Sequence, residues 1–199
     1  MNPNIRAQYP RLLLSLALLL SLACGLSGCD RSIDKELAAK AAAEKSLGIS
    51  GTLFATRFNR TLFEVLGDRK DDDAARMAPL YAIDVTALAN GEKSIFQTEV
   101  GPVRTAILGS FAHDGDLRSV GVLLAQRSQG ARDEFYLCAE TMSRVLTDGA
   151  KDKLPDLIKR LVNNALNNPG QRMSEVIGDK VLSAEIIKTG LLFQIEHQQ

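Results

Sequence analysis

Few side chains in this chain have the types and spacing needed for chemistry. The sequence contains two histidines, His113 and His197, and three cysteines. It has no Cys-x-x-Cys, Gly-x-Ser-x-Gly, His-Glu-x-x-His or glycine-rich phosphate-binding motif, so the common routes to nucleophilic or metal-assisted catalysis lack their parts. His113 stands near Asp114 and Asp116, but we interpret this segment as a hairpin turn, which needs such residues for its backbone. We therefore predict no catalytic residue, no metal site and no cofactor.

Cys138 is interpreted as a thiol of the hydrophobic core. It recurs with Phe135, Met142 and Val145 at helical spacing, which is typical of a buried helix face. A reactive thiol would need a basic neighbour or a histidine close by in the sequence, and the local sequence offers none. We expect Cys138 to be buried and inert.

The first residues of the chain have the three-part character of a secretion signal. Arg6 and Arg11 form a basic start, and residues 12–23 are almost entirely leucine, alanine and serine. This apolar stretch of roughly 12 residues has the length of a signal peptide and is well short of the ~20 residues that span a bilayer. We interpret it as a targeting segment that is removed.

The four residues Leu26, Ser27, Gly28 and Cys29 follow the apolar stretch. This run resembles the lipobox of bacterial lipoproteins, in which an aliphatic residue and two small residues precede the cysteine that receives lipid. The resemblance implies that the Cys29 thiol receives a diacylglyceryl group. It also implies cleavage between Gly28 and Cys29, so that Cys29 becomes the new amino terminus. We therefore expect attachment to a membrane through lipid on Cys29.

Three alternatives were weighed against this interpretation. Cys24 is the rival lipidation site, but Leu22 stands where a lipobox has a small residue. A plain secretory peptide would leave Cys29 as an ordinary thiol, and a retained membrane span would need a longer apolar stretch. The lipobox pattern at residues 26–29 favours lipidation of Cys29 over all three.

Asp30 directly follows the lipidated cysteine. In lipoproteins that resemble this one, from bacteria with two membranes, aspartate at this position commonly signals retention at the inner membrane. We expect the mature protein to face the periplasm, with the inner membrane favoured over the outer.

The charge balance argues against nucleic acid as a partner. The chain has 24 basic and 24 acidic side chains, and without Arg6 and Arg11 the remainder has 22 and 24, a net charge of −2. A protein that binds nucleic acid normally carries a basic surface. The residues after the signal peptide suffice for one domain with its own core.

The chain is expected to have three parts. Residues 1–28 are the signal peptide, residues 29–48 the lipidated start followed by a helical spacer, and residues 49–199 a single domain. The spacer helix is predicted over residues 32–47, where alanine, lysine and glutamate dominate. A helix packed on the domain through Ile33, Leu37 and Leu47 is the alternative, and both interpretations stay open.

Helical and alternating apolar patterns follow one another along the domain. Residues 52–66, 134–147 and 152–167 have helical spacing, and residues 68–77 are predicted to be a solvated loop. Strands are expected over residues 80–90, 95–100, 103–112 and 117–126, as a four-stranded antiparallel meander with a hairpin turn at Asn90 and Gly91. Two or three further strands are expected near the end of the chain, including 181–187 and 191–197.

Segregated strands and helices predict the α+β class. We expect an antiparallel sheet of about six strands, with helices packed on one face and a helical spacer before the domain.

Three kinds of function agree with these patterns. The favoured hypothesis is a non-enzymatic interaction or accessory module of the cell envelope, tethered to the membrane, with an envelope protein as its partner. The alternative is a periplasmic carrier lipoprotein for a small ligand or lipid, because helices over a sheet can enclose an apolar cavity. A hydrolase with paired carboxylates is the third, since pairing in space leaves no mark in the sequence.

Overall fold

A computed structural model describes residues 45–69, 73–89, 94–149 and 151–198 of the chain. The expected lipidation site at Cys29, the cleavage site at Gly28 and the sorting residue Asp30 lie outside these residues. So do the signal peptide and most of the predicted spacer.

Six strands form one antiparallel sheet in the order β1-β2-β3-β6-β5-β4. Two three-stranded meanders, β1-β2-β3 and β4-β5-β6, meet where β3 pairs with β6, with Val122 opposite Phe193. The strands are β1 (Ile95–Val100), β2 (Thr105–Phe111), β3 (Leu117–Leu124), β4 (Met173–Ile177), β5 (Lys180–Ile187) and β6 (Gly190–His197).

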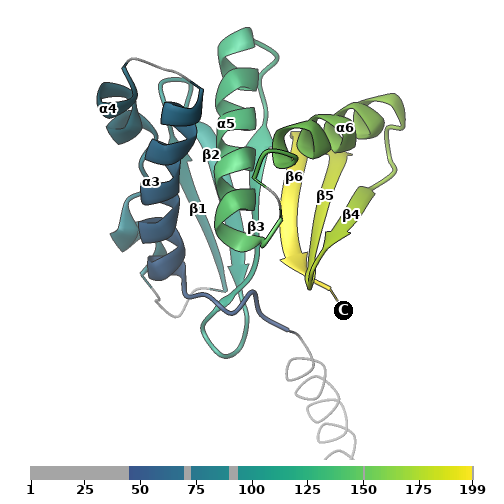
Figure 1. The fold of residues 1–199 in the computed structure, drawn as a ribbon. Coiled ribbons are helices and arrows are strands. Elements are labelled where there is room, and N and C mark those ends of the chain that lie inside the picture. The colour runs from purple at the N-terminus through teal and green to yellow at the C-terminus, as the bar shows by residue number, and fades with distance from the viewer. Residues whose placement is uncertain (1–44, 70–72, 90–93, 150, 199) are drawn as a thin grey trace, which may run out of the picture. The chain divides into compact units, whose positions relative to one another are not determined.

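Three long helices lie on one face of this sheet, as Figure 1 shows. They are α3 (Gly51–Asp68), α5 (Gln129–Leu146) and α6 (Leu154–Asn167). Ser50 begins α3 and Ser128 begins α5, because the hydroxyl of each accepts a hydrogen bond from a backbone N–H of the first turn. The α+β class, the six-stranded antiparallel sheet and the placement of the helices on one face are therefore confirmed.

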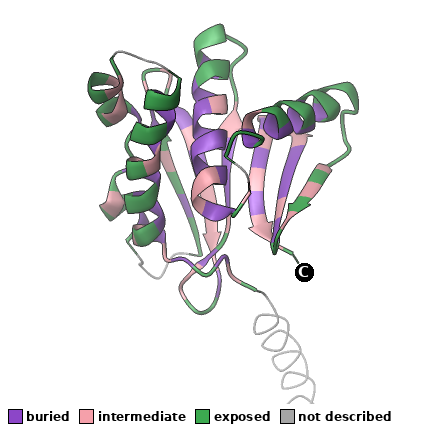
Figure 2. Cartoon of the chain, in the orientation of Figure 1, coloured by how far each residue is buried: buried purple, intermediate pink, exposed green. Residues whose placement is uncertain are grey.

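The core lies between the helices and the sheet, where the buried residues of Figure 2 gather. Phe54, Phe58 and Leu62 of α3 and Phe135 of α5 are fully buried, as the helical spacing predicted. Gly109 of β2 faces Phe96 of β1 across the ladder. A Cβ atom at Gly109 would lie 2.2 Å from the Phe96 ring, so the ring occupies the space that a side chain would fill.

The strand predicted over residues 80–90 is wrong. Residues 78–81 and 85–88 form two short 3₁₀ helices, η2 (Ala78–Tyr81) and η3 (Val85–Leu88). Between them, the Asn59 side chain of α3 binds the backbone of Ile83 twice, accepting from its N–H at 2.8 Å and donating to its C=O at 2.9 Å. The alternating apolar residues Tyr81 and Ile83 are buried against the core, but a side chain takes the place of a neighbouring strand. The meander before α5 accordingly has three strands, β1 to β3. The turn predicted at Asn90 and Gly91 lies outside the described residues.

Two other segments differ from the sequence interpretation. Ala74–Met77, inside the predicted loop, is a short helix, α4. Residues 45–47, the predicted end of the spacer helix, are not helical. Leu47 is instead buried, and its N–H donates to the Leu117 carbonyl of β3 at 2.6 Å. Within the part of the chain that the structure describes, no helix combines the length and the apolar character needed to cross a membrane.

Candidate functional site

Two adjoining hollows run along α5 and α6. The smaller, of about 420 Å³, is lined by residues of α3, α5 and the first turns of α6, together with Arg69. The larger, of about 790 Å³, lies near the start of α5, the second half of α6 and the turn between β5 and β6. Asp133 and Tyr136 of α5 line both hollows. Because they share these residues, we treat the hollows as one groove and call it the α5–α6 groove.

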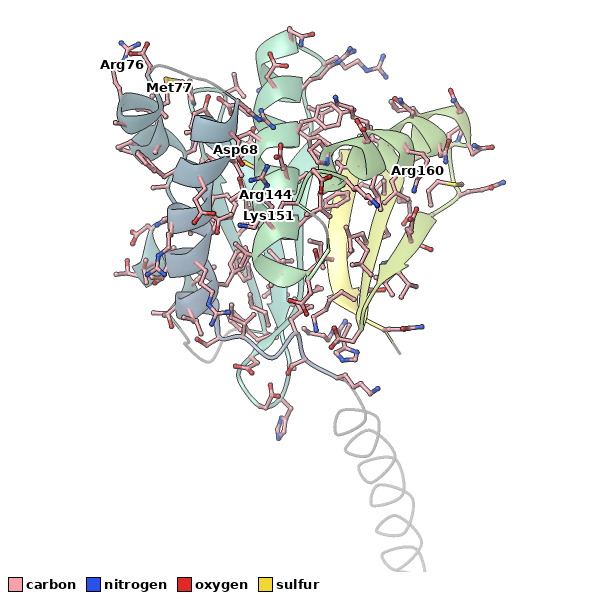
Figure 3. All side chains as sticks on the ribbon, in the orientation of Figure 1. Asp68, Arg76, Met77, Arg144, Lys151 and Arg160 are labelled. Carbon is pink, nitrogen blue, oxygen red and sulfur yellow. The ribbon has the colours of Figure 1, made fainter. Side chains whose placement is uncertain are left out.

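Charged side chains form a connected chain at the smaller hollow. Glu140 and Arg144 lie one turn apart on α5, and an Arg144 Nη2 to Glu140 Oε1 distance of 2.7 Å joins them. Arg69 binds the other Glu140 oxygen at 2.6 Å, and Asp68 binds Arg144 Nη1 at 2.5 Å. Figure 3 shows Asp68 and Arg144 next to each other where α3 meets α5. The four charges cancel, so the cluster is neutral as a whole.

Burial makes this charge cluster dependent on its pairing. The side chains of Glu140 and Arg144 are 6% and 7% exposed, whereas that of Asp68 is 63% exposed. Burial disfavours the charge on Arg144, but its hydrogen bond to Asp68 and the charge of Glu140 outweigh burial and raise the pKa of Arg144. The Nε atom of Arg144 is buried, and it has no hydrogen-bond partner within the described part of the chain. The cluster therefore holds the end of α3 against α5.

Tyr136 stands between the two hollows and is partly buried. Burial raises the pKa of its phenol, and the charge of Arg132 opposes that rise. Its ring contacts Phe135 edge-on, with ring centroids 5.5 Å apart. Tyr136 thus places a neutral hydroxyl group in the groove, and its ring packs against the buried ring of Phe135.

The larger hollow has an apolar floor and a polar rim. Val162 and Leu166 of α6 and Leu124 of β3 contribute to the floor, with Ile186, Ile187 and Leu191 of the β5–β6 hairpin. Leu166 is 54% exposed, so the apolar lining of the hollow extends to the protein surface. Arg127, Arg132 and Lys188 stand on the rim. Such a surface can bind apolar groups on its floor and negatively charged groups at its rim.

A second buried carboxylate fixes α5 to the sheet. Glu134 is 4% exposed and accepts hydrogen bonds from the Val103 N–H at 3.1 Å and the Thr105 hydroxyl at 2.9 Å. Both donors lie at the turn from β1 to β2. Glu134 positions the start of α5, which carries the rim of the groove.

The residues singled out from the sequence lie away from the groove. Cys138 is fully buried, as predicted, and burial raises the pKa of its thiol far above the ordinary value. His113 is exposed at the turn between β2 and β3, where the Asp116 N–H donates to Asp114 Oδ1 at 3.0 Å. His197 is partly buried, with its Nε2 3.2 Å from Asp179 Oδ2. Among the described residues, no three histidine, cysteine, aspartate or glutamate side chains are placed to hold a metal ion.

Sequence reasoning missed the charge cluster and the groove. The Glu140–Arg144 spacing of four residues on a predicted helix was the available signal, because such pairs face each other on one side of a helix. Asp68 and Arg69 could not be joined to that pair from sequence, since they are more than 70 positions away.

The fold and the groove define a class in general terms: an α+β domain with a helix layer on one face of an antiparallel sheet and an open groove in that layer. Searches of protein-family models, curated proteins and solved structures found no match for the chain.

Proposed function

We propose that this chain is a lipoprotein of the bacterial cell envelope that acts as a non-enzymatic interaction module, with the α5–α6 groove as its binding surface. Lipid on Cys29 anchors it to the membrane, and the groove receives a segment of an envelope protein. The observation that carries the proposal is the larger hollow, where the half-exposed Leu166 borders an apolar floor beneath a polar rim.

The chemistry of the groove supports binding rather than catalysis. Four charged side chains of the smaller hollow are engaged with one another: Glu140 is bound by Arg69 and Arg144, and Arg144 is bound to Asp68. The Cys138 thiol is enclosed in the core. Open grooves that combine apolar floors with polar rims are typical of surfaces that bind protein segments.

Site-specific photo-crosslinking in native membranes tests the proposal. A photoreactive residue replaces Leu166 in the groove or, as the matched control, Phe63 of α3. Leu166 is 54% exposed and Phe63 is 53% exposed. The two positions therefore have almost the same accessibility and differ only in their location on the protein. The proposal predicts a discrete cross-linked product from position 166 that is absent from position 63. Equal yields from both positions, or no product from position 166, would contradict it.

The same groove supports a second candidate, a carrier of a small ligand or lipid. A hollow of about 790 Å³ with an apolar floor has the size of small-molecule sites. Native mass spectrometry of protein purified from membranes separates the two functions. A bound small molecule that disappears when Leu166 is replaced by Glu favours the carrier, and protein with no mass beyond that of its covalent lipid favours the interaction module.

Retention at the inner membrane is proposed from Asp30 alone. Replacing Asp30 with Ser is expected to move the lipoprotein toward the outer-membrane fraction. Unchanged fractionation would remove this part of the proposal while leaving the groove untouched.

A further inference from the structure

The rim of the larger hollow carries a local excess of positive charge. Arg127 precedes α5, Arg132 lies in the first turns of α5, and Lys188 lies in the turn between β5 and β6. The acidic residue on this lining is Asp133, which already accepts a hydrogen bond from Gln129 at 2.8 Å. The lining therefore has a net charge of +2, although the whole chain has equal numbers of basic and acidic side chains.

These three cations are free to meet a ligand. All three residues are exposed, and none forms an ion pair within the described ranges of the chain. Elsewhere the exposed basic residues Arg76, Arg104 and Arg160 each pair with a carboxylate. The three rim cations thus lack the carboxylate partners that Arg76, Arg104 and Arg160 have.

Apolar residues line the same hollow as these three cations. Leu166 and Val162 come from α6, and Ile186 comes from β5. A ligand that fills the hollow must be apolar on one side and acidic on the other. A flat membrane surface could reach the rim charges, but it could not place groups on the floor of a hollow between two helices.

We infer that the groove binds an acidic amphipathic segment of its partner protein. Apolar side chains of that segment pack on Leu166 and the floor, and its carboxylates bind Arg127, Arg132 and Lys188. This inference rests on the proposed function, because it names the chemistry of the partner for the same groove. Complementary charge also speeds association and excludes basic segments.

Two synthetic peptides test the inference. Both are amphipathic helices of the same length with the same leucine stripe, and the polar face carries glutamate in one and lysine in the other. The lipidated protein is held in phosphatidylcholine nanodiscs on a sensor surface, with empty nanodiscs as the reference. We expect the glutamate peptide to bind about tenfold more tightly, since each exposed ion pair contributes a fraction of a kcal/mol. The preference for the glutamate peptide should shrink in about 1 M salt, where the Debye screening length is only about 3 Å.

Charge reversal identifies the residues responsible. In the triple variant Arg127→Glu, Arg132→Glu and Lys188→Glu, the preference should switch to the lysine peptide. The matched control reverses Arg57, Arg60 and Lys153, which are exposed and do not line the groove, and so changes the net charge equally. The control should keep the preference for glutamate. Urea unfolding of both triple variants verifies that they remain folded.

The outcomes separate this inference from the proposed function. Two results overturn the inference that the partner segment is acidic. One is equal binding of the two peptides, and the other is a change of preference in the control variant as well. Binding of anionic vesicles that needs the three rim cations, without binding of the glutamate peptide, overturns it in favour of a membrane contact. If position 166 cross-links a partner while neither peptide is preferred, the groove proposal stands and the inference about charge fails.

Discussion

Arg144 donates from its Nη2 to Glu140 Oε1 across 2.7 Å, one helical turn apart, with both side chains less than a tenth exposed. A buried ion pair contributes little compared with an apolar pair of the same size, but removal of one partner leaves an uncompensated charge. This pair therefore makes the junction of α3 and α5 sensitive to single substitutions.

Glu140→Ala should lower the free energy of unfolding by about 3–5 kcal/mol, because the buried Arg144 then keeps Asp68 alone as its partner. Urea unfolding measures this change. Glu175→Ala is the control, because its ion pair with Arg160 is exposed and should cost less than about 1 kcal/mol. A Glu140→Ala variant no less stable than the control would show that the cluster does not hold the helices together.

Asp68→Asn should change how stability depends on pH. The hydrogen bond from Arg144 holds the pKa of Asp68 below its ordinary value of 3.8. A carboxyl group whose pKa is lower in the folded state stabilises the protein above its unfolded pKa, and this contribution disappears as the pH falls through the folded pKa. Wild type should therefore exceed Asp68→Asn in stability at pH 7, and the difference should vanish in strong acid. Urea midpoints between neutral and acidic pH test this, and a difference independent of pH would refute it.

The Cys138 thiol should react with a thiol reagent only after unfolding. Its side chain is fully buried, and burial keeps it protonated. In the lipidated protein the Cys29 sulfur is expected to carry lipid. A thiol reagent that releases a coloured group on reaction therefore reports Cys138 through its absorbance. Native protein should show almost no reaction over the time in which urea-unfolded protein reacts completely. Fast labelling of native protein would mean that the core opens around α5.

Asn59→Ala should destabilise the protein by about 1–3 kcal/mol, because it leaves the N–H and C=O of Ile83 without their partner. Hydrogen exchange should show loss of protection at the Ile83 amide. Thr56→Ala on the same helix is the control, because its exposed hydroxyl bonds only to the Thr52 carbonyl. If the Ile83 amide stayed protected in Asn59→Ala, another group would have to hold this segment.

Periodicity predicted most of the fold because most elements bury one face. The helix expected over residues 52–66 is α3, and the strand expected over 95–100 is β1. The residues around Ile83 alternate like a strand, yet their backbone partner is the side chain of Asn59, which no period reveals. β4 was not located, because this edge strand is only partly buried and its sequence, Met-Ser-Glu-Val-Ile, does not alternate between apolar and polar residues.

The α5–α6 groove was harder to predict than the fold. Leu166 fits the apolar period of α6 but stands at the end of that stripe, half exposed at the groove. Arg127, Arg132 and Lys188 belong to different elements, and only the pairing of β5 with β6 and the packing of α5 beside α6 bring them together. Sequence periodicity describes each element, whereas the groove depends on how the elements meet.

We propose that lipid on Cys29 holds this domain at the membrane, and a comparison of two proteins measures this attachment. Wild type and Cys29→Ala are expressed in a bacterium with two membranes, then compared by intact mass and by flotation with membranes. We expect wild type to begin at residue 29, to carry added lipid mass and to float with membranes, and we expect Cys29→Ala to have no lipid mass. Soluble wild type with the same processing and mass as the variant, apart from the substitution, would contradict it.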